Sequence, residues 1–246
     1  MSLLANAAGN FLSTTLPYYQ AMPGIITPYG TLLKPGGRVA AYVRSTGAQD
    51  GEDHFAASGM LVTTLNAAMA RCRSGQGDII YVLPGHVENV SAVDNFPALV
   101  AGTQIISAGR PGATNNPTLT WTAATATFLF DVANVTMHGM TLNFDGADAV
   151  AAPIIVTGAG GAIIGCHINH GSSTTTDSLI GVTLNTGSDD FLFASNYSFT
   201  TSTATMTNVL AATATNNGLK IIGNYANVPL TTTNGAHGLN PGDRVR

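Results

Sequence analysis

Short apolar runs alternate with polar or glycine-rich turns through residues 128–227, and the alternation repeats four times. The first run of each repeat covers residues 128–132, 154–158, 180–184 and 209–213. A second run follows a turn and covers residues 135–140, 162–166, 192–196 and 220–224. Because the runs are short, rich in Ile, Val, Phe and Thr, and broken by Gly and Asn, they predict strands and not helices.

Two markers in these runs keep a similar period. One is the turn residue of the second run, which recurs after 26, 30 and 28 positions as Gly139, Gly165, Ser195 and Gly223. The other is an apolar position of the first run, which recurs after 26, 26 and 29 positions as Phe130, Val156, Val182 and Ala211. A period of this size with strand-like content indicates one unit stacked on itself. We predict an all-β chain that folds as a right-handed, single-stranded parallel β-helix.

The residue that follows the turn residue of each second run indicates a contact between coils. This position holds Met140, Cys166, Asn196 and Asn224. Asparagine tolerates left-handed backbone, and its amide can hydrogen-bond to an asparagine one coil away. We therefore expect Asn196 and Asn224 to form a ladder.

Residues 1–36 combine prolines and glycines with apolar and aromatic residues. Such a segment cannot hold a regular element, yet it has too many aromatic residues for a solvated linker. We expect an extended arm that orders against a partner. The alternative is an irregular strap over the end of this protein. The apolar residues proposed to bind the partner are Phe11, Tyr18, Tyr19, Ile25, Ile26 and Tyr29.

The β-helix is expected over residues 37–227, with a capping helix at about 58–72. Leu61, Leu65, Ala68, Met69 and Cys72 have helical spacing. A helix there would cover the first coil, whose core and strand edge are otherwise open. The turn-rich residues 228–246 are expected to form a C-terminal cap or tail.

Charged residues make up only 9% of the 246 residues, and the net charge is -4. A typical globular chain has roughly 25% charged residues. This surface has no electrostatic footprint for nucleic acid or an anionic membrane. The chain start lacks the features of a secretory signal, so we expect synthesis in a cytoplasm. Cys72 and Cys166 lie 94 positions apart and indicate neither a disulfide framework nor a metal motif.

The stretch from Asp50-Gly51 through the expected helix to Pro84-Gly85 resembles the beginning of pectin-lyase-like β-helix proteins. The resemblance covers residues 38–227. With its low charge and apolar arm, the chain also looks like bacteriophage virion proteins. The resemblance implies either a capsid decoration or cement protein, acting as a homotrimer on the major capsid protein, or a tail spike. Either would place the protein in a virion made in the cytoplasm of a bacterial host.

Candidate chemistry is sparse. Glycoside hydrolysis needs two carboxylates at a controlled separation, and Asp189-Asp190 is the only adjacent acidic pair in the coils. The pair resembles the acidic loop of polygalacturonases, and the segment around His237 resembles their Gly-His-Gly element. However, Gly187 stands where an aspartate is expected, and Ala236 interrupts the second motif. A solvated turn is the competing interpretation of Asp189 and Asp190.

Other chemistries have less support in the sequence. A lyase needs a basic residue to remove a proton, and Lys220 is the only Lys or Arg between Arg110 and Arg244. Asp145 and Asp148 fall short of the six or more oxygens that Ca²⁺ usually takes. Four histidines, His86, His138, His167 and His170, lack metal-motif spacing. We expect no metal or cofactor.

The preferred hypothesis is therefore a non-enzymatic virion protein that decorates or cements a phage capsid as a homotrimer, with the arm on the shell. The main alternative is a tail-spike-like β-helix that binds or cleaves a host surface polysaccharide, through Asp189, Asp190 and His237 if it is catalytic. A carbohydrate-binding solenoid without catalysis is a third possibility. Trp121, the only tryptophan, lies in an alternating run, where packing is a simpler interpretation than sugar stacking.

Overall fold

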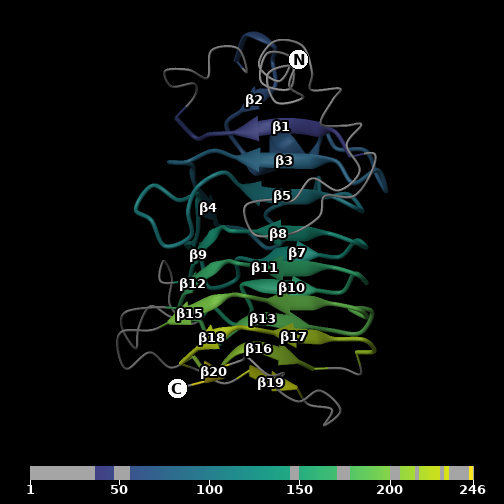
Figure 1. The fold of residues 1–246 in the computed structure, drawn as a ribbon, viewed down its shortest axis with the longest axis vertical. Coiled ribbons are helices and arrows are strands. Elements are labelled where there is room, and N and C mark those ends of the chain that lie inside the picture. Colours follow the sequence, from purple (N-terminus) through teal and green to yellow (C-terminus); the bar gives the residue numbers. More distant parts are fainter. Residues whose placement is uncertain are drawn as a thin grey trace, which may run out of the picture.

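The chain forms a parallel β-solenoid of about five turns (Figure 1). The computed structural model describes residues 37–46, 56–144, 150–170, 178–199, 206–213, 216–227, 230–232 and 244–245. The predicted arm, residues 1–36, lies outside these ranges. Every strand pair in the described residues is parallel, which confirms the parallel β-helix as the architecture.

Three sheets run along the solenoid. The eight-stranded sheet contains, in spatial order, β17 (Lys220–Ile222), β14 (Leu192–Ala194), β11 (Ala162–Ile164), β8 (Thr136–His138), β5 (Gln104–Ser107), β3 (Ile79–Val82), β1 (Val39–Val43) and β2 (Leu61–Val62). The five-stranded sheet contains β19 (Leu230–Thr232), β16 (Asn208–Ala212), β13 (Ile180–Leu184), β10 (Ile154–Val156) and β7 (Phe128–Phe130). The seven-stranded sheet contains β20 (Arg244–Val245), β18 (Tyr225–Ala226), β15 (Tyr197–Phe199), β12 (His167–Asn169), β9 (Thr141–Asn143), β6 (Thr118–Trp121) and β4 (Val87–Val90).

Each complete turn visits the five-stranded, eight-stranded and seven-stranded sheets in that order, as in β7, β8 and β9. The predicted first runs are strands of the five-stranded sheet, and the predicted second runs are strands of the eight-stranded sheet. The third strand of each turn is an addition to the prediction. It begins one residue after Met140, Cys166, Asn196 or Asn224. Strands β19 and β20, within the expected cap or tail, extend two of the sheets.

Alternate side chains of the strands fill the interior, as a parallel solenoid requires. In the eight-stranded sheet, Ile105, Met137, Ile163 and Phe193 occupy paired positions and belong to one continuous buried cluster. Each coil therefore covers an apolar layer of the next coil. This stacking is the main source of stability in a solenoid, because no single coil can bury its own apolar face.

The predicted register of the five-stranded sheet is wrong after Val156. Val156 pairs with Leu184 and not with Val182, and Ala211 pairs with Thr183. Strand β13 has apolar residues at both Val182 and Leu184, and both are buried. Because side chains alternate with a period of two, either residue satisfies the inward pattern. The pattern alone could not choose between them.

The predicted turn residues form a corner of left-handed backbone after the eight-stranded sheet. Gly139, Gly165, Ser195 and Gly223 have φ values of 68°, 61°, 53° and 63°. Their backbone amides donate hydrogen bonds to the next coil. Gly139 donates to the Ile164 carbonyl, and Gly165 donates to the Ala194 carbonyl. A second left-handed corner precedes the same sheet, at Asn134, Gly160, Asp190 and Gly218. In each of these coils, the strand of the eight-stranded sheet therefore lies between two left-handed corners.

The expected Asn ladder is confirmed. The side-chain oxygen of Asn224 accepts hydrogen bonds from the backbone and side-chain nitrogens of Asn196, at 2.9 and 3.1 Å. The oxygen of Asn196 in turn accepts the amide of Cys166 at 2.9 Å. Both asparagines are buried. Their amides thus replace backbone partners that the tight corner removes from the sheet.

The helix expected over residues 58–72 is wrong in extent. Residues Leu61–Val62 form β2, which pairs with Tyr42 and Val43 of β1, and the helix α4 covers only Leu65–Met69. Thr64 caps this helix by accepting the Ala67 amide. Its role as a cap of the solenoid stays a prediction. No helix in the described part of the chain combines the length and apolar composition that a membrane span requires.

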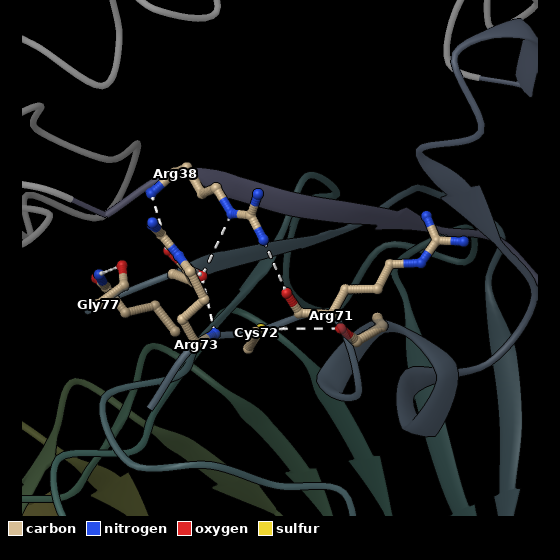
Figure 2. Close-up of polar contacts among 8 residues, drawn as sticks. Arg38, Arg71, Cys72, Arg73 and Gly77 are labelled. Atoms are coloured by element: carbon tan, nitrogen blue, oxygen red, sulfur yellow. Dashed lines mark hydrogen bonds and ion pairs between the residues drawn. The ribbon is translucent and has the colours of Figure 1, made fainter. Parts of the chain in front are cut away.

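A buried carboxylate joins the end of α4 to the first coils (Figure 2). Asp78 is fully buried, and its oxygens accept the Arg73 guanidinium at 2.7 and 3.0 Å and the Arg38 amide at 3.2 Å. Burial alone would raise the pKa of Asp78, but the hydrogen bonds from Arg73 and Arg38 outweigh burial and lower it. Arg38 also donates to the Arg71 carbonyl at 3.1 Å. These bonds fasten β1 to the segment that precedes β3.

Candidate interaction surface

Several residues singled out in the sequence lie outside the described ranges. They are the six arm residues Phe11, Tyr18, Tyr19, Ile25, Ile26 and Tyr29, the carboxylates Asp145 and Asp148, and His237. Their proposed roles stay predictions.

Asp189 and Asp190 lie in the corner between β13 and β14. The Asp189 carboxylate accepts the Asn217 amide at 2.8 Å, and its carbonyl accepts the Gly160 amide at 2.7 Å. Asp190 has a φ of 55°, a conformation that Asp adopts more readily than most residues. Both residues therefore have a clear part in the corner, as the turn interpretation expects. His237 lies outside the described residues, so its place beside Asp189 and Asp190 stays a prediction.

Trp121 packs in the core, as predicted. It is fully buried, its indole N–H donates to the Pro153 carbonyl at 2.9 Å, and its ring lies 4.7 Å from the Phe144 ring, edge to face. A buried indole needs such an acceptor, and here another coil supplies it. Trp121 is not available to a ligand at the surface.

The four histidines differ in environment. His86 is buried, and its Nε2 lies 3.0 Å from Glu88 Oε2, which also accepts the first amide of α4 at 2.8 Å. His170 is buried against the Ser198 hydroxyl, while His167 is half-buried on the outer side of β12. Within the described residues, no three His, Cys, Asp or Glu side chains are grouped to hold a metal ion.

The cysteines are separate and unreactive in character. Both are free thiols, with Cys166 buried and Cys72 half-buried. Burial raises the pKa of Cys166 to about 12 and is also the largest cause that raises the pKa of Cys72 to about 11. A thiol with such a pKa is almost entirely protonated at neutral pH, and the thiolate is the nucleophile and metal ligand.

The most distinctive surface feature is a stack of aromatic rings on the outer side of the seven-stranded sheet. His167, Tyr197 and Tyr225 occupy paired positions on β12, β15 and β18. The rings of Tyr197 and Tyr225 are stacked with centroids 5.1 Å apart and planes 3° apart, and His167 lies 5.2 Å from Tyr197. Tyr197 is 45% exposed. The stack runs along the solenoid axis because the strands are in register.

An amide pair lies in the neighbouring outward column of the same sheet. Asn143 and Asn169 occupy paired positions on β9 and β12, and the Asn169 amide donates to the Asn143 oxygen at 2.9 Å. We call His167, Tyr197, Tyr225, Asn143 and Asn169 the tyrosine face. Burial lowers the pKa of His167, so its imidazole is neutral at pH 7. The tyrosine face is therefore uncharged but rich in hydrogen-bonding groups.

The stacking geometry decides what this surface can bind. Tyr225 stacks flat on the Tyr197 ring, so that ring face is not open to the flat contact that a sugar makes with an aromatic ring, and His167 lies tilted by 49° against Tyr197. The tyrosine face combines these rings with the amide groups of Asn143 and Asn169. Such a mixture of aromatic and polar groups without charge is typical of the centre of a protein–protein interface.

The tyrosine face was not predicted from the sequence, although a signal was present. The dipeptides Asn196-Tyr197 and Asn224-Tyr225 repeat after 28 positions, the same interval as the corners that precede them. The Asn residues were assigned to a ladder, but the strand that follows each of them was not recognised. A third strand in each coil would have placed both tyrosines in one outward column.

Comparisons with protein-family models, with curated proteins and with solved structures find no match for this chain.

Proposed function

We propose that this chain is a non-enzymatic structural protein of a phage virion, which decorates or cements the capsid as a homotrimer. The observation that supports the proposal is the tyrosine face, an uncharged aromatic surface that follows the solenoid axis. Tyrosine is enriched and charge is depleted at the centre of protein interfaces. A face of this composition along the solenoid suits lateral contact between parallel solenoids.

In a trimer, the same face can form a contact in every subunit. In a cyclic assembly, each subunit contacts the next through two different surfaces, and the ring closes after three copies. The tyrosine face would supply one of these surfaces in every subunit. Because only 9% of the residues are charged, few ions lose hydration when two solenoids meet.

The arm residues, Phe11, Tyr18, Tyr19, Ile25, Ile26 and Tyr29, are the proposed contacts with the shell, since aromatic anchors dominate interface energetics. Replacing all six by serine should abolish binding to capsids that lack the protein while the β circular dichroism persists. Binding at the wild-type level would refute this assignment.

One observation supports the tail-spike alternative: Asp190 is an exposed carboxylate beside Asp189 at a corner of the coil. It makes a different prediction. If purified protein depolymerises a host surface polysaccharide, Asp189→Asn with Asp190→Asn should abolish that activity. Persistence of the activity in this variant would remove the pair from the reaction.

Light scattering after size exclusion tests the oligomer. We expect a native mass of three chains for the wild-type protein and of one chain for the variant Tyr197→Ser with Tyr225→Ser. The control is Val93→Ser, which changes an exposed apolar residue just after β4, at the opposite end of the seven-stranded sheet from β18, and should leave the trimer intact. A wild-type mass of one chain at micromolar concentration would refute the trimer. A trimer that survives the double substitution would remove the tyrosine face from the interface.

A further inference from the structure

Two outward residues flank the corner between the eight-stranded and seven-stranded sheets in each of the last two complete coils (Figure 1). Ala194 ends β14 and Tyr197 begins β15, while Ile222 ends β17 and Tyr225 begins β18. The residues next to them within these strands are buried, so the flanking residues point outward, because strand side chains alternate. The tyrosine face therefore has a second outward column directly across the corner.

This second column is exposed only near its end. Along it, His138 is 0% exposed, Ile164 is 9% exposed, Ala194 is half-buried and Ile222 is 45% exposed. Tyr197, on the other side of the corner, is also exposed. Accessible apolar and aromatic groups thus occur on both sides of the corner in the same two coils.

The segment that leaves β5 bounds the tyrosine face at its other end. A Cβ atom added at Gly112 would lie 3.6 Å from His167 Nδ1, so this segment, residues 108–117, reaches His167. Tyr197 and Tyr225 lie one and two coils beyond His167. The rings beyond the segment therefore belong to the same coils as Ala194 and Ile222.

A trimer of parallel solenoids restricts which surfaces can meet. Rotation about an axis parallel to the solenoid leaves every coil at its own height, so the tyrosine face meets the same coils of the next subunit. Each subunit of a closed ring also needs two different surfaces, one for each neighbour. These surfaces lie on the two sides of the edge nearest the axis. The corner that Ala194 and Ile222 share with Tyr197 and Tyr225 meets both conditions.

The same corner leaves room for three subunits to approach each other. Ser195 and Gly223 are exposed, and a Cβ atom added at Gly223 would meet only the Ser195 hydroxyl oxygen, at 3.8 Å. Asn196 and Asn224, the other two corner residues, are buried in the ladder. The corner therefore presents only small groups to a neighbouring molecule.

We propose that Ala194 and Ile222 form the second surface of the trimer contact and pack against Tyr197 and Tyr225 of the next copy of this chain. The inference rests on the proposed trimer and adds the surface on the opposite side of each contact. The corners of three copies meet at the axis, and each contact joins an apolar column to an aromatic one. Neither column carries a charged residue in these two coils.

One other exposed apolar residue lies in the same coils. The large apolar residues of the described chain that are exposed are Val87, Val93, Leu179, Tyr197 and Ile222. Val87 and Val93 belong to the first coils, and Leu179 directly precedes β13 of the five-stranded sheet. Only three positions separate Ala194 from Tyr197, whereas 11 separate Tyr197 from Asn208, where the five-stranded sheet resumes. Ile222 is therefore nearer to the tyrosine rings, and Leu179 provides the comparison.

Single charge substitutions in the full chain test the assignment. By light scattering after size exclusion, we expect Ile222→Glu to have the mass of one chain where the wild-type protein has the mass of three. The contact would otherwise bury a carboxylate against an uncharged face. Leu179→Glu, at a position that is 41% exposed, should keep the mass of three chains. A trimeric Ile222→Glu or a monomeric Leu179→Glu would overturn the proposal.

Photo-cross-linking tests the contact without adding a charge. Ile222→p-benzoylphenylalanine keeps an apolar group at the exposed position and makes it reactive. The variant is prepared with ¹⁴N and with ¹⁵N, and the two forms are mixed in urea and refolded together. We expect fragmentation of the cross-linked peptides to place the link at Tyr197 or Tyr225, in pairs that include mixed isotopes. Links to other residues, or pairs of a single isotope alone, would overturn the proposal.

These results separate the second surface from the trimer itself. A wild-type mass of one chain would refute the trimer and, with it, this inference. A wild-type trimer that survives Ile222→Glu but is dissociated by Tyr197→Ser with Tyr225→Ser would refute the second surface alone. The tyrosine face would then keep its place in the contact.

Discussion

Asn196 is the side chain on which the corner of the last coils most depends. Its oxygen accepts the Cys166 amide, and its nitrogen donates to the Ile163 carbonyl at 2.9 Å and to the Asn224 oxygen at 3.1 Å. Asn196→Leu should lower the free energy of unfolding by about 3 kcal/mol, because it leaves buried backbone groups without partners. Urea unfolding monitored by circular dichroism measures this cost.

Asn169→Ala is the matched control for that substitution. Asn169 is half-buried, and its side chain donates one hydrogen bond, to Asn143. The expected cost is about 1 kcal/mol or less, because water can replace the lost bond. Equal costs for Asn196→Leu and Asn169→Ala would contradict the special role of the buried ladder.

His170 makes stability depend on pH. Burial, and then the nearby His167, lowers the pKa of His170 from 6.5 to about 4. The unfolded chain therefore binds a proton at a pH where the native chain does not. Stability is retained above pH 6.5 and falls as the pH drops from 6.5 toward 4. Between pH 7 and pH 5, this histidine should remove about 2 kcal/mol from the free energy of unfolding.

The variant His170→Gln isolates this contribution, because it leaves the buried His138 in place. Chemical unfolding at pH 7 and at pH 5 should show a smaller loss of stability in the variant than in the wild-type protein. If both proteins lose the same free energy between the two pH values, His170 is not the group that titrates.

Among the elements, two coils approach each other closely at Gly158, just after β10. A Cβ atom added there would lie 2.2 Å from the Val132 carbonyl oxygen of the preceding coil. The obstacle is backbone, so it cannot rotate away. Gly158→Ala should therefore destabilise the protein by about 3 kcal/mol or force the coils apart. Thermal and urea unfolding both report this loss.

Gly59→Ala provides the comparison. A Cβ atom at Gly59 meets nothing within 4 Å, but φ is 69°, so only the cost of left-handed backbone remains. That cost is about 1 to 2 kcal/mol. A smaller effect at Gly158 than at Gly59 would show that the coils can separate more easily than their geometry indicates.

At the level of elements, the sequence predicted what strong local signals encode. Gly139, Gly165 and Gly223 mark left-handed corners, and glycine is the residue that adopts this backbone most easily. The third strand of each coil was missed because only two corner residues separate it from the second strand, as Gly139 and Met140 do between β8 and β9. With so short a corner between them, the two strands look like one run.

The helix prediction failed in extent for a related reason. Leu61 and Leu65 are four positions apart, which fits a helix, but Leu61 pairs in β2 with Tyr42 of β1. A tertiary partner decides between strand and helix at such a short apolar run, and spacing alone does not. Pairing over long distances also set the register of β13, where two apolar residues fitted equally well.

At the scale of the molecule, the parallel solenoid could be predicted because its repeat is written along the chain. The candidate surface could not. The tyrosine face requires three strands, one from each of three coils, to be in register. That register depends on how the coils stack, and the sequence of one coil does not contain this information.

The proposed role in a virion depends most directly on the copy number of this chain relative to the major capsid protein. Quantitative mass spectrometry of purified particles from the source of the chain measures this ratio. A capsid decoration or cement protein predicts a ratio near one or a simple fraction of it. A few copies per hundred capsid proteins would point to a spike or fibre, and complete absence from the particles would contradict the virion proposal.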